Sequence, residues 1–155
     1  MRGKVARRTA VHYGYDYGYN SGTIHPTAPP PPFLDRYRAR AAALIARPAE
    51  ALAQVLILGY PPGAGIGWHR DRPIFGPEVV GISLLAQSVM KLRPAGATRG
   101  GLRVTLEPRS AYVLAGPARS EWQHHVPAVE GLRYSITFRT VVKGTRRLEP
   151  SVEAS

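Results

Sequence analysis

A histidine and a carboxylate lie two residues apart at the end of a Gly- and Pro-rich stretch, YPPGAGIGWHRD, which spans Tyr60–Asp71. In an extended strand successive side chains alternate between the two faces, so His69 and Asp71 point the same way. An imidazole and a carboxylate on one face supply two of the three groups of a 2-His-1-carboxylate site. Such a site holds Fe(II) and leaves coordination positions open for chemistry.

The missing ligand has two candidates in the segment WQHHV, His124 and His125. Because side chains alternate along a strand, these adjacent histidines point to opposite faces. Only one of them can face His69 and Asp71. The alternation alone leaves open which one it is.

Two arginines share one face of the segment RYSITFR, residues 133–139. Its polar residues alternate with aromatic and aliphatic ones, so Arg133, Thr137 and Arg139 lie on a single face. If that face looks inward, the arginines need anionic partners, because an unpaired buried charge is very costly. A dicarboxylate, or one carboxylate plus Asp71, would suit them. The alternative is an amphipathic edge strand whose arginines lie in water.

The composition predicts one globular domain, residues 1–155, with 44% apolar residues. Within it, residues 1–33 read as a basic, Tyr-rich lid followed by a proline linker, and residues 143–155 read as a charged tail. The absence of cysteine leaves His, carboxylate and water as the available metal ligands. No leader peptide or membrane-length apolar run of about 20 residues is visible. We therefore expect a cytoplasmic, monomeric protein that does not associate with membranes.

The net charge is +11, from 21 Lys and Arg against 10 Asp and Glu. Nearly all of the positive charge is arginine, which makes bidentate contacts to phosphate. Such a balance favours nucleic acid as a partner through counterion release. A GC-rich genome would also produce an Arg-rich composition, so charge alone names no function.

The segment HYGYDYGY, residues 12–19, has tyrosine at every second position. If it is extended, the tyrosines share a face on which a base or another planar substrate could stack. The alternative is an edge strand that packs on the core. The interleaved glycines favour a loop or lid.

The remaining pattern predicts one helix followed by short strands. Four prolines, residues 29–32, form a stiff polyproline spacer, and Leu34–Arg47 reads as a helix that stops before Pro48. Strands separated by Gly and Pro breakers are then expected at residues 54–59, 66–71, 79–86, 89–93, 101–106, 111–115, 121–126 and 133–142. This pattern predicts a mainly β fold, a sandwich or jelly roll, with one supporting helix.

Four motifs in this order resemble the AlkB family of Fe(II)/2-oxoglutarate dioxygenases. They are YPPG followed by GWHRDRP, then ISL, then WQHHVP, then RYSITFR, and the similarity covers about residues 7–142. The family fold is a double-stranded β-helix, or jelly roll, which agrees with the strand pattern.

The resemblance implies that His69, Asp71 and His124 are the iron ligands. The family spacing Trp-x-His-x-Ile/Val selects His124, and His125, which stands where a glycine is usual, is the fallback ligand.

The resemblance also implies the cosubstrate contacts. Arg133 would hold the distal carboxylate of 2-oxoglutarate beside the Tyr60 hydroxyl, and Arg139 would lie between the proximal carboxylate and Asp71. Thr137 is assigned to the same site. Leu58 stands where the family often has asparagine, so one hydrogen bond to the cosubstrate is expected to be missing, a loss of about 1 kcal/mol.

For the substrate, the resemblance places the Tyr-rich segment in the nucleotide-binding lid. Tyr13 or Tyr15 would stack on a flipped methylated base while arginines contact the flanking phosphates. Trp68 and Arg72 flank the metal strand and are expected to line the substrate cavity. Family members usually have a further strand and helix before the basic segment. The resemblance therefore implies either a minimal form or a chain whose front is missing, and a shortened lid in both cases.

The implied activity is oxidative demethylation of alkylated DNA or RNA bases, with Fe(II), 2-oxoglutarate and O2. One alternative is the same oxygenase chemistry on a protein or a small molecule. Another is a basic nucleic-acid-binding domain with a vestigial metal site, which the complete set of ligands and arginines argues against. A zinc hydrolase ranks last, because it gives the paired arginines no role.

Overall fold

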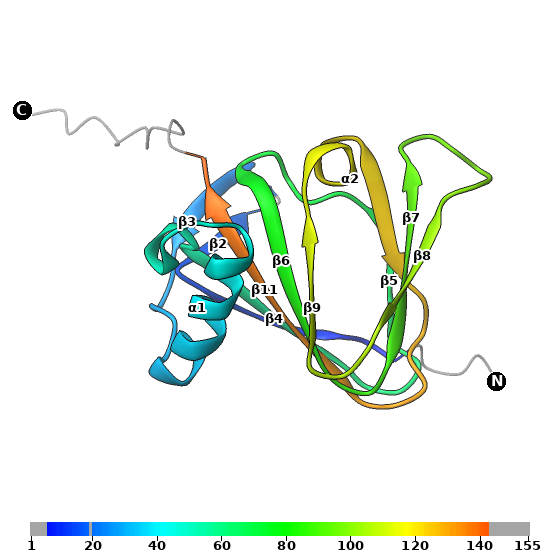
Figure 1. The fold of residues 1–155 in the computed structure, drawn as a ribbon, viewed down its shortest axis with the longest axis horizontal. Coiled ribbons are helices and arrows are strands. Elements are labelled where there is room, and N and C mark those ends of the chain that lie inside the picture. The colour runs from blue at the N-terminus through cyan, green and yellow to red at the C-terminus, as the bar shows by residue number, and fades with distance from the viewer. Residues whose placement is uncertain (1–5, 19, 143–155) are drawn as a thin grey trace, which may run out of the picture.

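Two antiparallel β-sheets face each other in this computed structural model, which describes residues 6–18 and 20–142 (Figure 1). The major sheet has the strand order β1-β4-β11-β6-β9 and consists of β1 (Thr9–Tyr13), β4 (Gln54–Tyr60), β11 (Arg133–Val141), β6 (Phe75–Leu85) and β9 (Ser110–Leu114). The minor sheet has the order β5-β10-β7-β8 and consists of β5 (Ile66–His69), β10 (Trp122–Val126), β7 (Ser88–Pro94) and β8 (Leu102–Leu106). The predicted mainly β jelly roll is confirmed.

The helix α1 (Asp35–Leu44) covers the outer face of the major sheet, at the left of Figure 1. The 3-10 turn η1 (Pro32–Leu34) leads into it, and a second 3-10 turn, η2 (Ala49–Ala51), follows it. The small buried residues Ala41 and Ala42 let the helix approach the sheet closely. The regular helix ends earlier than the predicted Leu34–Arg47, since Ala46 takes a positive φ of 51°.

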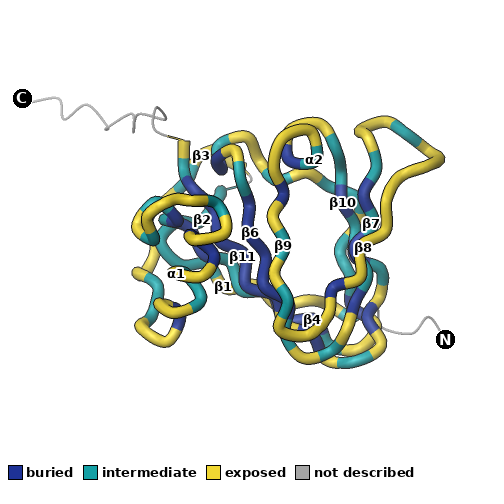
Figure 2. Tube along the Cα trace, viewed as in Figure 1, coloured by how far each residue is buried: buried dark blue, intermediate teal, exposed yellow. Residues whose placement is uncertain are grey.

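The strand β11 lies in the middle of the major sheet, between β4 and β6. Its apolar residues Ile136 and Phe138 pack beneath α1. Its polar residues therefore face the space between the sheets, where Arg133 is 1% exposed and Arg139 is 6% exposed. The interpretation of this segment as a solvated edge strand is wrong. The dark, buried stretches of β6 and β11 are visible in Figure 2.

The Tyr-rich segment forms strands, which corrects the predicted loop or lid. β1 pairs with β4 at the edge of the major sheet, and β2 (Tyr15–Gly18) pairs with β3 (Thr23–Pro26) in a separate hairpin. Gly14, with φ at +79°, separates β1 from β2. This break interrupts the alternation, so the tyrosines do not share one continuous strand face; Tyr19 lies outside the described residues.

Three further boundaries differ from the prediction. The metal strand β5 ends at His69, so Asp71 lies in the connection that follows it. β6 begins at Phe75 rather than Val79 and includes Pro77, which reads as a breaker in the sequence. A second helix, α2 (Gly116–Ser120), forms where only a Gly-Pro breaker was expected, because proline is well suited to the first turn of a helix.

Within the part of the chain that the structure describes, no helix is long and apolar enough to cross a bilayer.

Candidate metal centre and cosubstrate site

A cavity of about 430 Å³ lies between the two sheets and brings together residues from both. His69 comes from the end of β5, His124 from β10 and Asp71 from the connection after β5. The major sheet contributes Tyr60, Arg133 and other side chains of its inner face. The cavity is therefore built where the two sheets face each other across the core.

His69, Asp71 and His124 each offer one ligand atom, and these atoms all lie within 4.8 Å of one another. His69 Nε2 is 3.7 Å and His124 Nε2 is 3.8 Å from Asp71 Oδ1. His69 and His124 are directly opposite each other in the β5–β10 pair, which puts both imidazoles on the cavity side. Two imidazoles and one carboxylate at this separation are the donor set of a 2-His-1-carboxylate iron site.

Each histidine directs its Nε2 toward Asp71. His69 Nδ1 donates to the carbonyl oxygen of Gly67 at 2.8 Å, so in the neutral imidazole the lone pair is on Nε2. Burial lowers the pKa of His124 to about 4, and the neighbouring His69 adds to the effect. His124 is therefore neutral at physiological pH, as metal ligation requires.

His125 points to the opposite face of β10. Its Nδ1 lies 2.6 Å from the carbonyl oxygen of Ile66, and its ring centroid is 5.2 Å from that of Trp68. It is absent from the group of side chains that could hold a metal. The choice that strand alternation left open thus falls to His124, and the fallback ligand has a structural role.

Asp71 is held as an ionised carboxylate. Burial alone would raise its pKa, but the charge of Arg139, followed by His124 and His69, outweighs this effect and lowers the pKa. Arg139 Nη1 donates to Asp71 Oδ2 at 3.0 Å, which leaves Oδ1 toward the histidines. The pairing predicted between Arg139 and Asp71 is therefore present in the structure.

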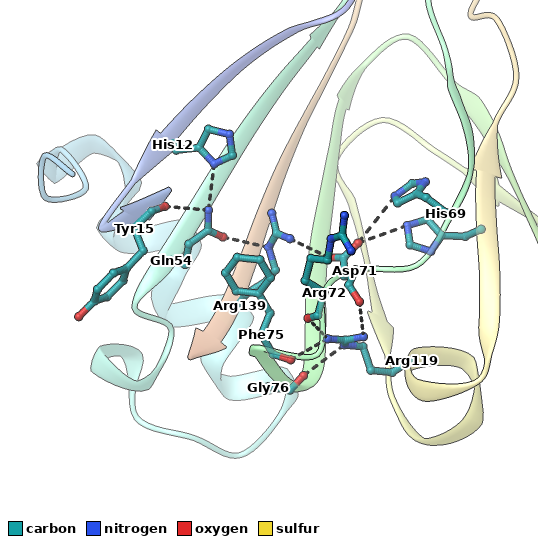
Figure 3. Close-up of polar contacts among 11 residues, drawn as sticks. His12, Tyr15, Gln54, His69, Asp71, Arg72, Phe75, Gly76, Arg119 and Arg139 are labelled. Carbon is teal, nitrogen blue, oxygen red and sulfur yellow. Dashed lines mark hydrogen bonds and ion pairs between the residues drawn. The ribbon is translucent and has the colours of Figure 1, made fainter. Parts of the chain in front are cut away.

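Arg119 of α2 fixes the connection that carries Asp71 (Figure 3). Its guanidinium donates to the backbone carbonyls of Asp71 (3.2 Å), Arg72 (2.9 Å), Phe75 (2.6 Å) and Gly76 (3.2 Å). Because β5 has already ended, this clamp rather than strand alternation places the carboxylate. Nothing in the sequence around Gly116-Pro117 pointed to Arg119.

A hydrogen-bond chain runs from Arg139 to the N-terminal strands (Figure 3). Arg139 Nε donates to Gln54 Oε1 at 2.9 Å. The amide nitrogen of Gln54 lies 3.2 Å from both His12 Nδ1 and the carbonyl oxygen of Tyr15. Gln54 is fully buried, so its amide is oriented by these partners alone. In the sequence, only its position at the start of a predicted strand distinguishes Gln54.

Arg133 carries an unused donor inside the cavity. Its Nε donates to Ser83 Oγ at 3.1 Å, its Cζ lies 5.0 Å from the centre of the Tyr60 ring, and its Nη1 is buried with no hydrogen-bond partner. A buried guanidinium edge without an acceptor is costly. The carboxylate of a dicarboxylic acid would satisfy it, so the residues present fit 2-oxoglutarate.

Two tyrosine hydroxyls lie in the same cavity. Burial raises the pKa of Tyr60 and raises the pKa of Tyr112 to about 12, although Arg133 opposes the shift in both cases. Both hydroxyls therefore stay protonated and can donate to a carboxylate. Tyr112 lies opposite Gly81 across β9 and β6, and sequence reasoning missed it.

The other predicted cosubstrate residues, Leu58 and Thr137, also line the cavity. Leu58 lies opposite Ser135 in the β4–β11 pair, and both it and Thr137 are 9% exposed. The hydrocarbon side chain of Leu58 cannot form a hydrogen bond, so the missing contact to the cosubstrate stays a prediction.

The structure places the predicted substrate residues differently. Arg72 lines the cavity, whereas Tyr13, Tyr15 and Trp68 do not. Tyr13 packs against the core beneath α1, because the alternation of β1 turns its neighbour His12 to the cavity instead.

Among the described tyrosines of residues 12–19, Tyr17 of β2 lines the cavity. Its ring lies 5.3 Å from the guanidinium carbon of Arg72. The period-two pattern thus predicted Tyr13 and Tyr15 for the substrate, whereas in the structure Tyr17 is the described residue of this tyrosine pattern that lines the cavity.

The family model of the 2OG-Fe(II) oxygenase superfamily matches residues 2–139. The chain belongs to this superfamily. Within it, the chain is AlkB-like, because relatives with AlkB-homologue names match it. It is 38% identical over 105 residues to the mouse protein "Alpha-ketoglutarate-dependent dioxygenase alkB homolog 7, mitochondrial", a match that covers 60% of this chain and 48% of that protein.

Two further relatives have a lower sequence identity of 30%. An uncharacterised protein, L905, of Acanthamoeba polyphaga mimivirus is 30% identical over 102 residues, which cover 58% of this chain and 49% of that protein. Mouse ALKBH8, named as a tRNA (carboxymethyluridine(34)-5-O)-methyltransferase, is 30% identical over 127 residues, which cover 79% of this chain and 19% of that protein. The chain thus spans about half the length of the first relatives and much less of ALKBH8.

Among solved structures, that of OsALKBH1 superposes with a TM-score of 0.69 at 17% sequence identity, covering 86% of this chain and 78% of that one. At this identity the match concerns the fold, and it agrees with the jelly roll. Superfamily membership implies Fe(II), 2-oxoglutarate and O2 as cofactor and cosubstrates, which the donor set and the unpaired edge of Arg133 fit.

Proposed function

We propose that this chain is an Fe(II)/2-oxoglutarate-dependent dioxygenase that oxidatively demethylates alkylated nucleic acid bases, in direct-reversal repair or in RNA demethylation. One observation carries the proposal. The His69–Asp71–His124 group and the unpaired Nη1 of Arg133 line the same cavity. A redox metal and a dicarboxylic acid would therefore bind side by side.

The residue roles follow from the contacts. His69 Nε2, Asp71 Oδ1 and His124 Nε2 would hold Fe(II), and Arg139 orients Asp71 and keeps it ionised. Arg133 would bind one carboxylate of 2-oxoglutarate.

When bound, Fe(II) and 2-oxoglutarate supply with O2 the oxidising power that hydroxylates an N-methyl group. Tyr60 and Tyr112 remain protonated donors next to the carboxylate. The apolar side chains of Leu56, Met90 and Leu114 line the cavity and limit access of water. These residues bind, orient and shield the reactants.

Nucleic acid is proposed as the substrate because the cavity is lined by cations together with an aromatic ring. Arg8, Arg70 and Arg72 line it along with Tyr17. Arginine is well suited to phosphate, and a tyrosine ring offers a stacking surface for a flipped base. The net charge of +11 acts in the same direction. The printed name of the relative ALKBH8 refers to tRNA.

The direct test is formaldehyde release from oligonucleotides that carry N-methylated bases, in DNA and RNA, with Fe(II) and 2-oxoglutarate. We expect release from at least one methylated strand, none from the unmethylated strand, and slower release with Arg133→Met that rises as more 2-oxoglutarate is added. If wild-type protein converts 2-oxoglutarate to succinate but releases no formaldehyde from any methylated strand, the nucleic acid substrate is wrong. The alternative is then the same chemistry on a protein or small molecule. A cytoplasmic monomer remains an expectation from the sequence.

A further inference from the structure

The outer face of the minor sheet carries cations and no acidic residue. β5, β7, β8 and β10 contain Lys91, Arg93 and Arg103 but neither Asp nor Glu. In β7 the side chains of Met90 and Leu92 are buried, so those of Lys91 and Arg93 point outward. Among the described residues, no ion pair joins any of these three cations to a carboxylate.

Two of these cations lie directly opposite each other. Arg103 pairs with Lys91 across β8 and β7, and Lys91 pairs with His125 across β7 and β10. Directly opposite side chains have Cβ atoms about 4.5–5.5 Å apart, and like charges in this relation destabilise a sheet. Among residues 6–18 and 20–142, this like-charge pair has no carboxylate within ion-pair distance to offset it. An external anion would do so.

Protection of a sheet edge explains only part of this arrangement. Charged residues on an edge strand prevent pairing with other chains, and β8 is an edge strand, which accounts for Arg103. Lys91, however, lies on β7, between β10 and β8. An interior strand needs no such protection, so the cationic row requires another explanation.

An aromatic group lies beside the row. The guanidinium carbon of Arg93 is 4.0 Å from the centre of the Trp68 ring, and the Trp68 ring is 5.2 Å from that of His125. Trp68 faces away from the catalytic cavity. An arginine stacked on an aromatic ring keeps the edge of its guanidinium available for phosphate oxygens.

This face is open in the described part of the chain. α1 packs on the major sheet, and β7 and β8 lie on the side of the molecule away from it (Figure 1). Arg103 is exposed, while Lys91 and Arg93 are partly exposed. A long polyanion can therefore reach all three cations at once.

We propose that the outer face of the minor sheet, formed by Lys91, Arg93, Arg103, Trp68 and His125, binds the sugar–phosphate backbone of nucleic acid outside the catalytic cavity. The surface supplies a row of cations, which suit phosphates, so its contacts would be independent of sequence. It would hold a strand whose target base occupies the cavity on the other side of the sheet. The choice of nucleic acid as the ligand rests on the proposed function. The experiment below can contradict this surface and the proposed function separately.

The test compares two double variants with the same change in net charge. Lys91→Gln/Arg103→Gln alters the proposed surface, and Arg36→Gln/Arg40→Gln removes two exposed cations from α1. Binding of a fluorescently labelled, unmethylated single-stranded DNA oligonucleotide is measured by anisotropy over a range of salt concentrations. Succinate formation from 2-oxoglutarate without substrate verifies that each variant is folded and has an intact metal site.

We expect the surface variant to bind about tenfold more weakly. Loss of two phosphate contacts should reduce its slope of log K against log salt by about 1.4, at about 0.7 per phosphate of a single strand. The α1 variant should keep the wild-type slope. Equal losses in both variants would overturn the proposal in favour of net charge.

Labelled poly-glutamate of matched charge tests whether the surface binds acidic protein instead of nucleic acid. If it binds as tightly as DNA and loses as much affinity in the surface variant, the surface recognises acidic protein and the proposal is overturned. Oligonucleotide binding that depends on Lys91 and Arg103, with no demethylation of any strand, would support this surface and contradict the proposed function.

Discussion

At the scale of single residues, the two buried arginines of β11 differ in their hydrogen-bond partners. Arg133 and Arg139 occur on one strand face, yet their environments differ. Arg139 has Asp71 and Gln54 as partners, whereas the Nη1 of Arg133 has none. The pattern RYSITFR predicted that both arginines bind carboxylates on one inward face. Only the three-dimensional structure shows which of them has a donor without a partner. This difference identifies the end of the cavity where a carboxylate would bind.

Replacement of Arg133 by methionine should weaken 2-oxoglutarate binding about 10- to 100-fold, or about 1.5–3 kcal/mol, because a charge-assisted hydrogen bond is lost. Calorimetry with Mn(II)-loaded protein measures this affinity without turnover. The stability should change little, since methionine fills much of the same buried space. Unchanged affinity for 2-oxoglutarate would show that Arg133 does not bind it.

The stability of the metal-free protein should fall in acid because of His124. Folding lowers the pKa of this residue from 6.5 to about 4. The unfolded chain therefore takes up a proton at a higher pH than the folded chain, and stability is full above about pH 6.5. It should decrease toward pH 4 by at most about 3 kcal/mol. The lowered pKa of Asp71 acts in a separate window, below 3.8.

Urea unfolding in EDTA at a series of pH values measures this loss. His124→Gln is the control, because it removes this imidazole and should make the curve shallower between pH 6.5 and pH 4. A smaller slope remains from His12, whose pKa burial also lowers. A wild-type curve as flat as that of the variant would contradict the neutral, buried state of His124.

At the scale of secondary structure elements, strand pairing explains the positions of the histidines but not that of Asp71. The register of β5 and β10 places His69 and His124 directly opposite each other, so that both imidazoles lie on the cavity side. Asp71 lies beyond the end of β5 and depends on the hydrogen bonds that Arg119 donates to the following carbonyls. A short helix distant in sequence thus holds one of the three ligands in place.

Arg119→Ala should lower Fe(II) affinity about 10- to 100-fold, the usual effect of removing a group that orients a metal ligand. Arg119→Lys should recover part of this loss, because an ammonium group can reach some of the same carbonyls. Metal titration is compared with thermal unfolding, which detects general damage to the fold. If affinity for the metal is unchanged in folded Arg119→Ala, Asp71 does not need this clamp.

At the scale of the whole molecule, the strand pattern predicted the jelly roll, since breakers separate β-rich segments along most of the chain. The first strands were missed, because glycines in HYGYDYGY suggested a loop, whereas Gly14 provides the turn between two strands. Which tyrosine of this segment lines the cavity depends on the faces that β1 and β2 present. That information comes from sheet pairing, which local sequence does not contain.

The candidate metal ligands and the two arginines of β11 could be predicted from the sequence, because they lie within short motifs. Arg119, Gln54 and Tyr112 could not be found in this way. Each acts through contacts with residues distant along the chain, such as Gly76 for Arg119 and Arg139 for Gln54. Long-range partners of this kind appear only when the two sheets are assembled.

The central claim is that His69, Asp71 and His124 hold Fe(II) next to bound 2-oxoglutarate. The most direct measurement is the visible absorption spectrum after anaerobic addition of Fe(II) and 2-oxoglutarate, because a 2-oxo acid chelated to ferrous iron gives a weak charge-transfer band. We expect this band in wild-type protein and in His125→Ala, and its loss in His124→Ala. A folded wild-type protein without the band, or a band lost only in His125→Ala, would contradict the account.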